Sequence, residues 1–92
     1  MSLSTPASEI AIWERVIRPE RGDLPPDAAR FFLSLAFEPD DLGRIHELAV
    51  KNQDGTLTPE EAEALHNYRQ VGLQIDLLRS KARLAMQQPP AT

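Results

Sequence analysis

Apolar residues recur at intervals of three and four along most of this chain, a spacing that is typical of amphipathic helices. The longest uninterrupted segment with this spacing runs from Leu57 to Met86. Three shorter segments precede it, and each begins beside a proline. The pattern therefore predicts an all-α protein in which three short helices pack on one long C-terminal helix, about residues 59–86.

Proline delimits the three shorter helices, because it is tolerated in the first helical turn and pushes the residue before it out of the α region. We expect these helices at about residues 6–18, 26–37 and 39–52. Each carries apolar side chains on one face: Ile10, Trp13, Val16 and Ile17; Phe31, Phe32, Leu35 and Phe37; Leu42, Ile45, Leu48 and Ala49. We expect the second set, which holds the three phenylalanines, to belong to the core.

The long helix has two apolar sides when its residues are placed around a wheel at about 100° each. Leu73, Leu77 and Leu84, the second stripe, lie on a different side from the broad face and are the predicted interaction residues. Pairing of the long helices in a homodimer, a different protein partner, or wrapping by the shorter helices would each bury this stripe. The broad face should cover the shorter helices: Leu65, Tyr68, Val71, Gly72, Ile75, Leu78, Ala82, Ala85 and Met86.

Length and composition indicate one small folded domain spanning residues 1–92, with flexible ends at 1–5 and 88–92. Hydrophobic residues make up 41% of the chain and charged residues 26%, which is too apolar for a disordered protein. A chain of 92 residues can bury only a thin core, and small proteins often gain stability by association. We therefore expect a homo-oligomer or a protein partner, and favour the homodimer.

The chain lacks cysteine, which excludes disulfides and thiolate metal sites, and it lacks an apolar run long enough to span a bilayer. Because its beginning also shows no secretory signal, we expect a cytoplasmic protein with no membrane partner. His46-Glu47 begins a zinc-protease motif, but Val50 stands where the second histidine is needed. The other histidine, His66, has no partner in the sequence pattern. We expect no catalytic residue, metal or cofactor, and hence no enzyme.

The formal net charge of −4 disfavours a general nucleic-acid binder, because phosphate neutralisation needs a basic surface. Basic residues nevertheless gather toward the end of the long helix, while glutamates gather at its start. We interpret this arrangement as favourable to the helix dipole. The alternative function is a DNA-binding regulator that uses the basic residues of the long helix: Arg69, Arg79, Lys81 and Arg83.

The entrance to the long helix, residues 50–61, imitates the twelve-residue calcium loop of an EF-hand. Its first ligand position is Val50, which cannot coordinate a hard cation. A capping box explains the same residues without a metal: Thr58 is the N-cap, Pro59 the first helical residue and Glu61 the reciprocal partner. We therefore expect a helix cap here and no bound calcium.

Several short runs share one wider pattern: Arg18-Pro19-Glu20, Ala28-Ala29-Arg30-Phe31, Leu57-Thr58-Pro59-Glu60-Glu61, Leu65, Tyr68, Val71-Gly72, Leu78 and Ser80-Lys81-Ala82-Arg83-Leu84. This pattern resembles a family of small uncharacterised bacterial helical proteins, often encoded beside an HNH-type endonuclease. The resemblance implies an accessory protein that holds a nuclease in check in the manner of an antitoxin. It assigns no functional residues, and the chain departs from it at Pro25, where a capping residue is usual.

Overall fold

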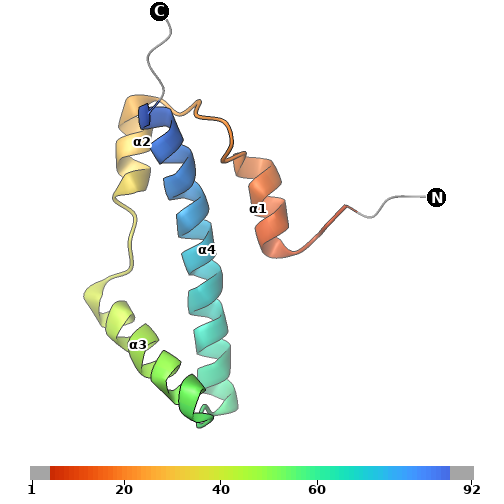
Figure 1. Cartoon of the computed structure of the whole chain (residues 1–92), viewed down its shortest axis with the longest axis vertical. Helices are drawn as coiled ribbons and strands as arrows, with labels where there is room; N and C mark the ends of the chain where they lie inside the picture. The colour runs from red at the N-terminus through yellow and green to blue at the C-terminus, as the bar shows by residue number, and fades with distance from the viewer. Residues whose placement is uncertain (1–4, 88–92) are drawn as a thin grey trace, which may run out of the picture. The chain divides into compact units, whose positions relative to one another are not determined.

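The computed structural model describes residues 5–87, and this part of the chain contains four helices and no strand. The helices are α1 (Glu9–Ile17), α2 (Pro26–Leu33), α3 (Pro39–Asp54) and α4 (Pro59–Gln87) (Figure 1). Each of the first three contacts the long α4. The structure therefore confirms the predicted all-α fold, with three short helices packed on one long C-terminal helix.

Contacts between residues divide the chain into two compact units. The terminal unit, residues 1–35 and 73–92, holds α1, α2 and the second half of α4. The hairpin unit, residues 36–72, holds α3 and the first half of α4. Cooperative folding as one domain stays a prediction. So does the flexibility expected of the two ends, because residues 1–4 and 88–92 lie outside the described part of the chain.

The hairpin unit is delimited by the signals that the sequence carries. Proline occupies the first turn of α3. Gly55 caps the C-terminal end of the helix with a left-handed φ of 70°, which glycine adopts without steric cost. This helix continues to Asp54, two residues beyond its expected end. Leu48 of α3 and Leu65 of α4 are the buried apolar residues of the unit.

In the terminal unit, α1 runs in the same direction as α4. Gln74 of α4 donates a hydrogen bond of 2.7 Å to Glu9 at the start of α1, and Lys81, two turns further along α4, bonds to the carbonyl of Arg18 at the end of α1. The first helix begins later than expected, because the Ser8 hydroxyl accepts the N–H of Ala11 and caps the helix there.

The second helix, α2, is shorter than expected and ends at Leu33 instead of Phe37. Its last turn is tightened by a bond from the N–H of Ser34 to the carbonyl of Phe31, to which the Ser34 hydroxyl also donates. Phe37 therefore lies in the connection before α3, where its ring packs edge-on against Tyr68 at a centroid distance of 5.8 Å.

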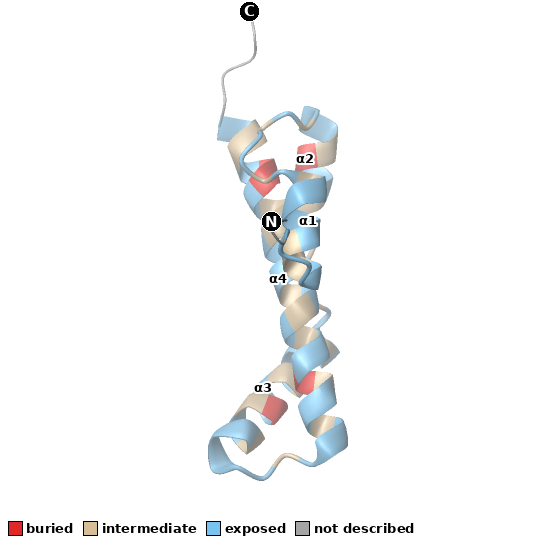
Figure 2. Cartoon of the chain, turned by 90° about the vertical axis from the view of Figure 1, so that its right-hand side faces the viewer, coloured by how far each residue is buried: buried red, intermediate tan, exposed pale blue. Residues whose placement is uncertain are grey.

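The core is as thin as the length of the chain predicts. Among the described residues, the buried apolar ones are Ala29, Leu48, Leu65 and Ala82, on α2, α3 and α4 (Figure 2). The expectation that Phe31 belongs to the core is wrong, because no neighbouring helix covers its side chain, which is 62% exposed. Large apolar side chains remain exposed on every helix: Ile12, Trp13, Val16, Phe31, Leu42, Val50, Val71, Leu73 and Met86.

Candidate functional site

The second stripe lies entirely in the terminal unit, on the second half of α4. Leu73 is 47% exposed, whereas Leu77 and Leu84 are half-buried. Leu77 and Leu84 are thus partly covered within the terminal unit, whereas Leu73 stays accessible. A partner that covers this side of α4 would remove all three from water.

Another exposed apolar group lies on α1, in the same unit as the second stripe. Ile12, Trp13 and Val16 are spaced one turn or less apart and are all more than a third exposed. The sequence placed Trp13 and Val16 on one apolar face, but the pattern of one helix does not show whether a neighbour covers that face. Phe31 of α2, predicted as core, is 62% exposed in the same unit.

Lys81 is the main polar connection within the terminal unit. Its ammonium group lies 2.6 Å from a carboxylate oxygen of Asp23 and donates to the carbonyls of Arg18 and Arg21 at 3.2 and 3.0 Å. The residue is only 8% exposed. The hydrogen bond from Lys81 lowers the pKa of Asp23, although burial acts in the opposite direction. Lys81 thus holds the segment between α1 and α2 against α4.

The local backbone helps to form this lysine anchor, defined as Lys81 with its three partners. Arg18 has a φ of 54°, in the left-handed region that residues with a Cβ rarely adopt. Its own N–H bonds to the carbonyl of Glu14, and its carbonyl faces the Lys81 ammonium. The Arg18-Pro19 pair predicted the end of α1, but no feature of the sequence indicated that Lys81 would bind there.

The predicted nucleic-acid residues are distributed over both units. Arg69 belongs to the hairpin unit, whereas Arg79, Lys81 and Arg83 belong to the terminal unit. The ammonium group of Lys81 is occupied and buried, and the half-buried Arg79 has an Nε atom without a partner in the described structure. Arg83 is exposed. The dipole interpretation holds for the acidic first turn of α4, but the last turn carries no basic residue.

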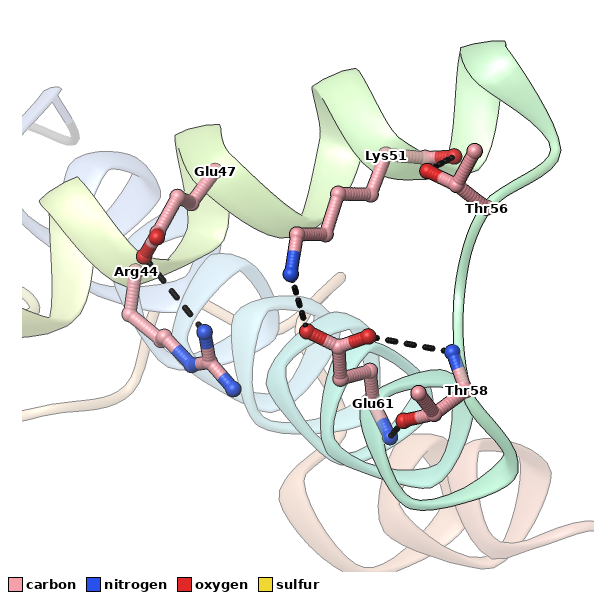
Figure 3. Close-up of polar contacts among 6 residues, drawn as sticks. All are labelled: Arg44, Glu47, Lys51, Thr56, Thr58 and Glu61. Atoms are coloured by element: carbon pink, nitrogen blue, oxygen red, sulfur yellow. Dashed lines mark hydrogen bonds and ion pairs between the residues drawn. The ribbon is translucent and has the colours of Figure 1, made fainter.

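The entrance to α4 confirms the predicted capping box (Figure 3). The N–H of Thr58 donates to Glu61 Oε1 at 3.0 Å, and the N–H of Glu61 donates to the Thr58 hydroxyl at 3.1 Å. The sequence did not reveal that Lys51 of α3 would bind Glu61 Oε2 at 2.6 Å. Hydrogen bonds from Lys51 and from the backbone of Thr58 lower the pKa of Glu61 to about 2. Both oxygens of this carboxylate therefore have partners from the protein.

Neither histidine is part of a group that resembles a metal site. His46 and His66 are both exposed. Among residues 5–87, no three side chains of the histidine, aspartate and glutamate types are grouped closely enough to hold a metal ion. The same part of the chain contains no helix with the length and apolar character that crossing a membrane requires.

A surface pocket of about 470 Å³ lies in the hairpin unit, between the start of α3 and the first half of α4. Tyr68 donates a hydrogen bond of 2.6 Å to Asp41 Oδ1, and this bond raises the pKa of Tyr68. The pocket was missed from sequence because Asp41 and Phe37 lie 27 or more residues from Tyr68 in the chain. Its lining residues are Phe37, Asp41, Ala64, Asn67, Tyr68 and Val71.

Comparisons of the chain with family models, with curated proteins and with solved structures find no match. The resemblance to small bacterial proteins encoded beside an HNH-type endonuclease therefore stays a prediction.

Proposed function

We propose that this protein is a small helical interaction module that forms a homodimer through the second stripe of α4. The observation that carries the proposal is the 47% exposure of Leu73 in a chain with so few buried apolar residues. Complete burial of a fully exposed leucine contributes about 1.5–3 kcal/mol, so covering the exposed half of Leu73 contributes about half of that in each subunit, which matters for a protein with a thin core.

The distribution of charge favours the terminal unit as the surface where two copies meet. It contains six acidic and seven basic residues, a formal charge of +1. The hairpin unit contains eight acidic and three basic residues, a formal charge of −5. A two-fold interface places the same surface of both subunits together, so a strongly charged surface would repel its copy. The nearly neutral terminal unit does not have this disadvantage.

The exposed residues of α1 extend the apolar surface that a second copy can cover. Tryptophan is over-represented among the residues that dominate binding energy at interfaces, and Trp13 is flanked here by Ile12 and Val16. Lys81 fixes the end of α1 on α4 within the same unit. The exposed side chains therefore stand on a helix that is held in place before association.

Light scattering after size exclusion tests the dimer. We expect the wild-type protein at twice the chain mass of 10.3 kDa, and the Leu73→Glu variant at the mass of one chain. Leu73 is the suitable position because it is the most exposed leucine of the stripe, so its substitution affects folding least. Leu42→Glu is the matched control: it makes the same change at a 54% exposed site of the hairpin unit and should leave the dimer intact.

A monomeric wild-type protein, or a Leu73→Glu variant that stays dimeric, would contradict the homodimer.

The second form of the proposal, implied by the resemblance, is a complex in which the same stripe binds a nuclease and holds it in check. Co-expression with that nuclease tests this form, since Leu73→Glu should abolish co-purification while Leu42→Glu should not.

A further inference from the structure

We infer that the pocket of the hairpin unit binds an arginine side chain presented by a basic partner polypeptide. This site is separate from the second stripe, which lies in the terminal unit. The inference adds a second partner to the proposed function and does not depend on the homodimer.

The walls of the pocket suit the apolar stem and planar head of arginine. Phe37 and Val71 contribute apolar surface, and the rings of Phe37 and Tyr68 stand at 74° to each other. A guanidinium group stacks on aromatic faces and is weakly hydrated, so it enters such a site at a lower desolvation cost than an ammonium group. The volume of about 470 Å³ accommodates one extended side chain.

The polar end of the pocket provides the complementary charge. Asp41 is half-buried and uses Oδ1 to accept the Tyr68 hydroxyl, while a carboxylate has further acceptor positions on both oxygens. Within residues 5–87, Asp41 forms no ion pair with a lysine or an arginine, and the nearby Arg44 is paired with Glu47 at 3.4 Å. The amide of Asn67 adds a second polar group to the lining.

The charge around the pocket selects a basic partner over a neutral one. The hairpin unit has a formal charge of −5, and Asp40 adjoins Asp41 in the chain while Glu38 precedes it by three residues. A surface of one sign raises the local concentration of oppositely charged groups and speeds their association. The same surface would disfavour nucleic acid, whose phosphates carry the same sign of charge.

Titration by ¹⁵N–¹H NMR with the peptide acetyl-Ala-Leu-Arg-Leu-Ala-amide tests the site. We expect the signals of Asn67 and Val71 to shift on binding. A peptide with citrulline in place of arginine keeps the shape but loses the charge. It should bind about five- to tenfold more weakly, as expected when a charged hydrogen bond becomes a neutral one.

Two variants of matched charge locate the effect. Asp41→Asn should abolish the preference for arginine over citrulline, while Asp40→Asn removes the same charge next to the pocket and should preserve it. Asparagine can still accept the Tyr68 hydroxyl, and circular dichroism verifies that both variants fold. If both variants lose the preference for arginine equally, the net charge of the unit, and not the position of Asp41 in the pocket, causes that preference. This result would overturn the inference.

Three further results would also contradict it. Equal binding of the arginine and citrulline peptides would indicate that the pocket does not distinguish a charged side chain from a neutral one. Equal binding of free acetyl-arginine amide and the peptide would indicate a small-molecule site instead of a polypeptide site. No shift of Asn67 and Val71 at millimolar peptide would exclude the pocket. Because Leu73 does not line the pocket, repeating the titration in Leu73→Glu separates this inference from the fate of the dimer.

Discussion

The two compact units each join their helices through a lysine and a carboxylate, but they differ in what surrounds that pair. In the hairpin unit, Lys51 is 41% exposed in its side chain, and Leu48 and Leu65 form the buried core. In the terminal unit, the Lys81 side chain is 10% exposed, and the buried apolar residues are the alanines Ala29 and Ala82.

This difference indicates how each unit is stabilised. Buried apolar area contributes about 25 cal/mol per Å², so two buried leucines contribute far more than two buried alanines. The hairpin unit therefore depends mainly on apolar packing, to which it adds an ion pair whose Glu61 side chain is only 14% exposed. The terminal unit depends more on the lysine anchor and leaves Leu73 and Trp13 accessible. It is the unit that gains most from a partner.

The largest effect is expected in the core of the hairpin unit. Leu48→Ala should lower the free energy of unfolding by about 2–5 kcal/mol, because it removes buried methyl groups and leaves a cavity. Urea denaturation monitored by circular dichroism measures the change. Leu42→Ala on the same helix, at a 54% exposed position, is the control and should cost much less. Similar losses in both variants would show that the leucine core does not support this unit.

The next effect concerns the lysine anchor of the terminal unit. Lys81→Met keeps the stem but removes the ammonium group, so we expect a loss of about 1–3 kcal/mol from the unfilled hydrogen bonds of its partners. Arg83→Met is the control at an exposed neighbour and should change stability little. If both variants are equally stable, the anchor contributes nothing and the comparison between the units fails.

The Lys81→Met variant should also change the pKa of Asp23 and thereby the dependence of stability on pH. Lys81 lowers the pKa of Asp23, so the ionised pair stabilises the protein above the ordinary pKa of aspartate, and this contribution disappears as the pH falls through the lowered value. In Lys81→Met, the pKa of Asp23 measured by NMR should rise toward its ordinary value. An unchanged pKa would indicate that another group holds the carboxylate.

Local signals in the sequence predicted the ends of several elements but not their packing. Pro39, Gly55 and the pair Thr58 and Glu61 fix the hairpin unit, because a cap or a fixed φ acts within a few residues. Ser8 was missed because Thr5-Pro6 offers a similar signal nearby. The all-α fold could be predicted from these helix start and end signals together with the three- and four-residue spacing of the apolar positions.

Packing and long-range contacts could not be predicted in the same way. A helical wheel shows that Val16, Phe31 and Leu73 are on apolar faces, but whether a neighbouring helix covers those faces depends on the tertiary arrangement. The binding of Lys81 to two carbonyls across 60 or more residues has no sequence signature. The same holds for the pocket that Tyr68 and Asp41 form. The exposed leucine was the part of the candidate site that periodicity could indicate.

A smaller effect is expected for the Lys51–Glu61 pair of the hairpin unit. Because Lys51 and Thr58 lower the pKa of Glu61 from 4.5 to about 2, its ionised form stabilises the protein above pH 4.5, and this contribution is lost as the pH falls toward about 2. Glu61→Gln should therefore reduce the pH dependence of unfolding in that range. Glu60→Gln, an exposed neighbour, is the control. Equal pH profiles for wild type and Glu61→Gln would contradict the role of the Lys51 pair.

The smallest effect tests whether packing requires glycine within α4. Within residues 5–87, a Cβ at Gly72 would meet only the Phe37 ring, at the ordinary contact distance of 3.8 Å, so no backbone of this part of the chain requires a glycine here. Gly72→Ala should therefore raise the free energy of unfolding by up to about 1 kcal/mol, the helix preference of alanine over glycine. Gly43→Ala in α3 is a matched control, since a Cβ there meets nothing within 4 Å. A gain at Gly43 with a loss at Gly72 would show that the Phe37–Tyr68 packing cannot accept even a methyl group, and that the hairpin unit is packed more tightly than its exposed surface indicates.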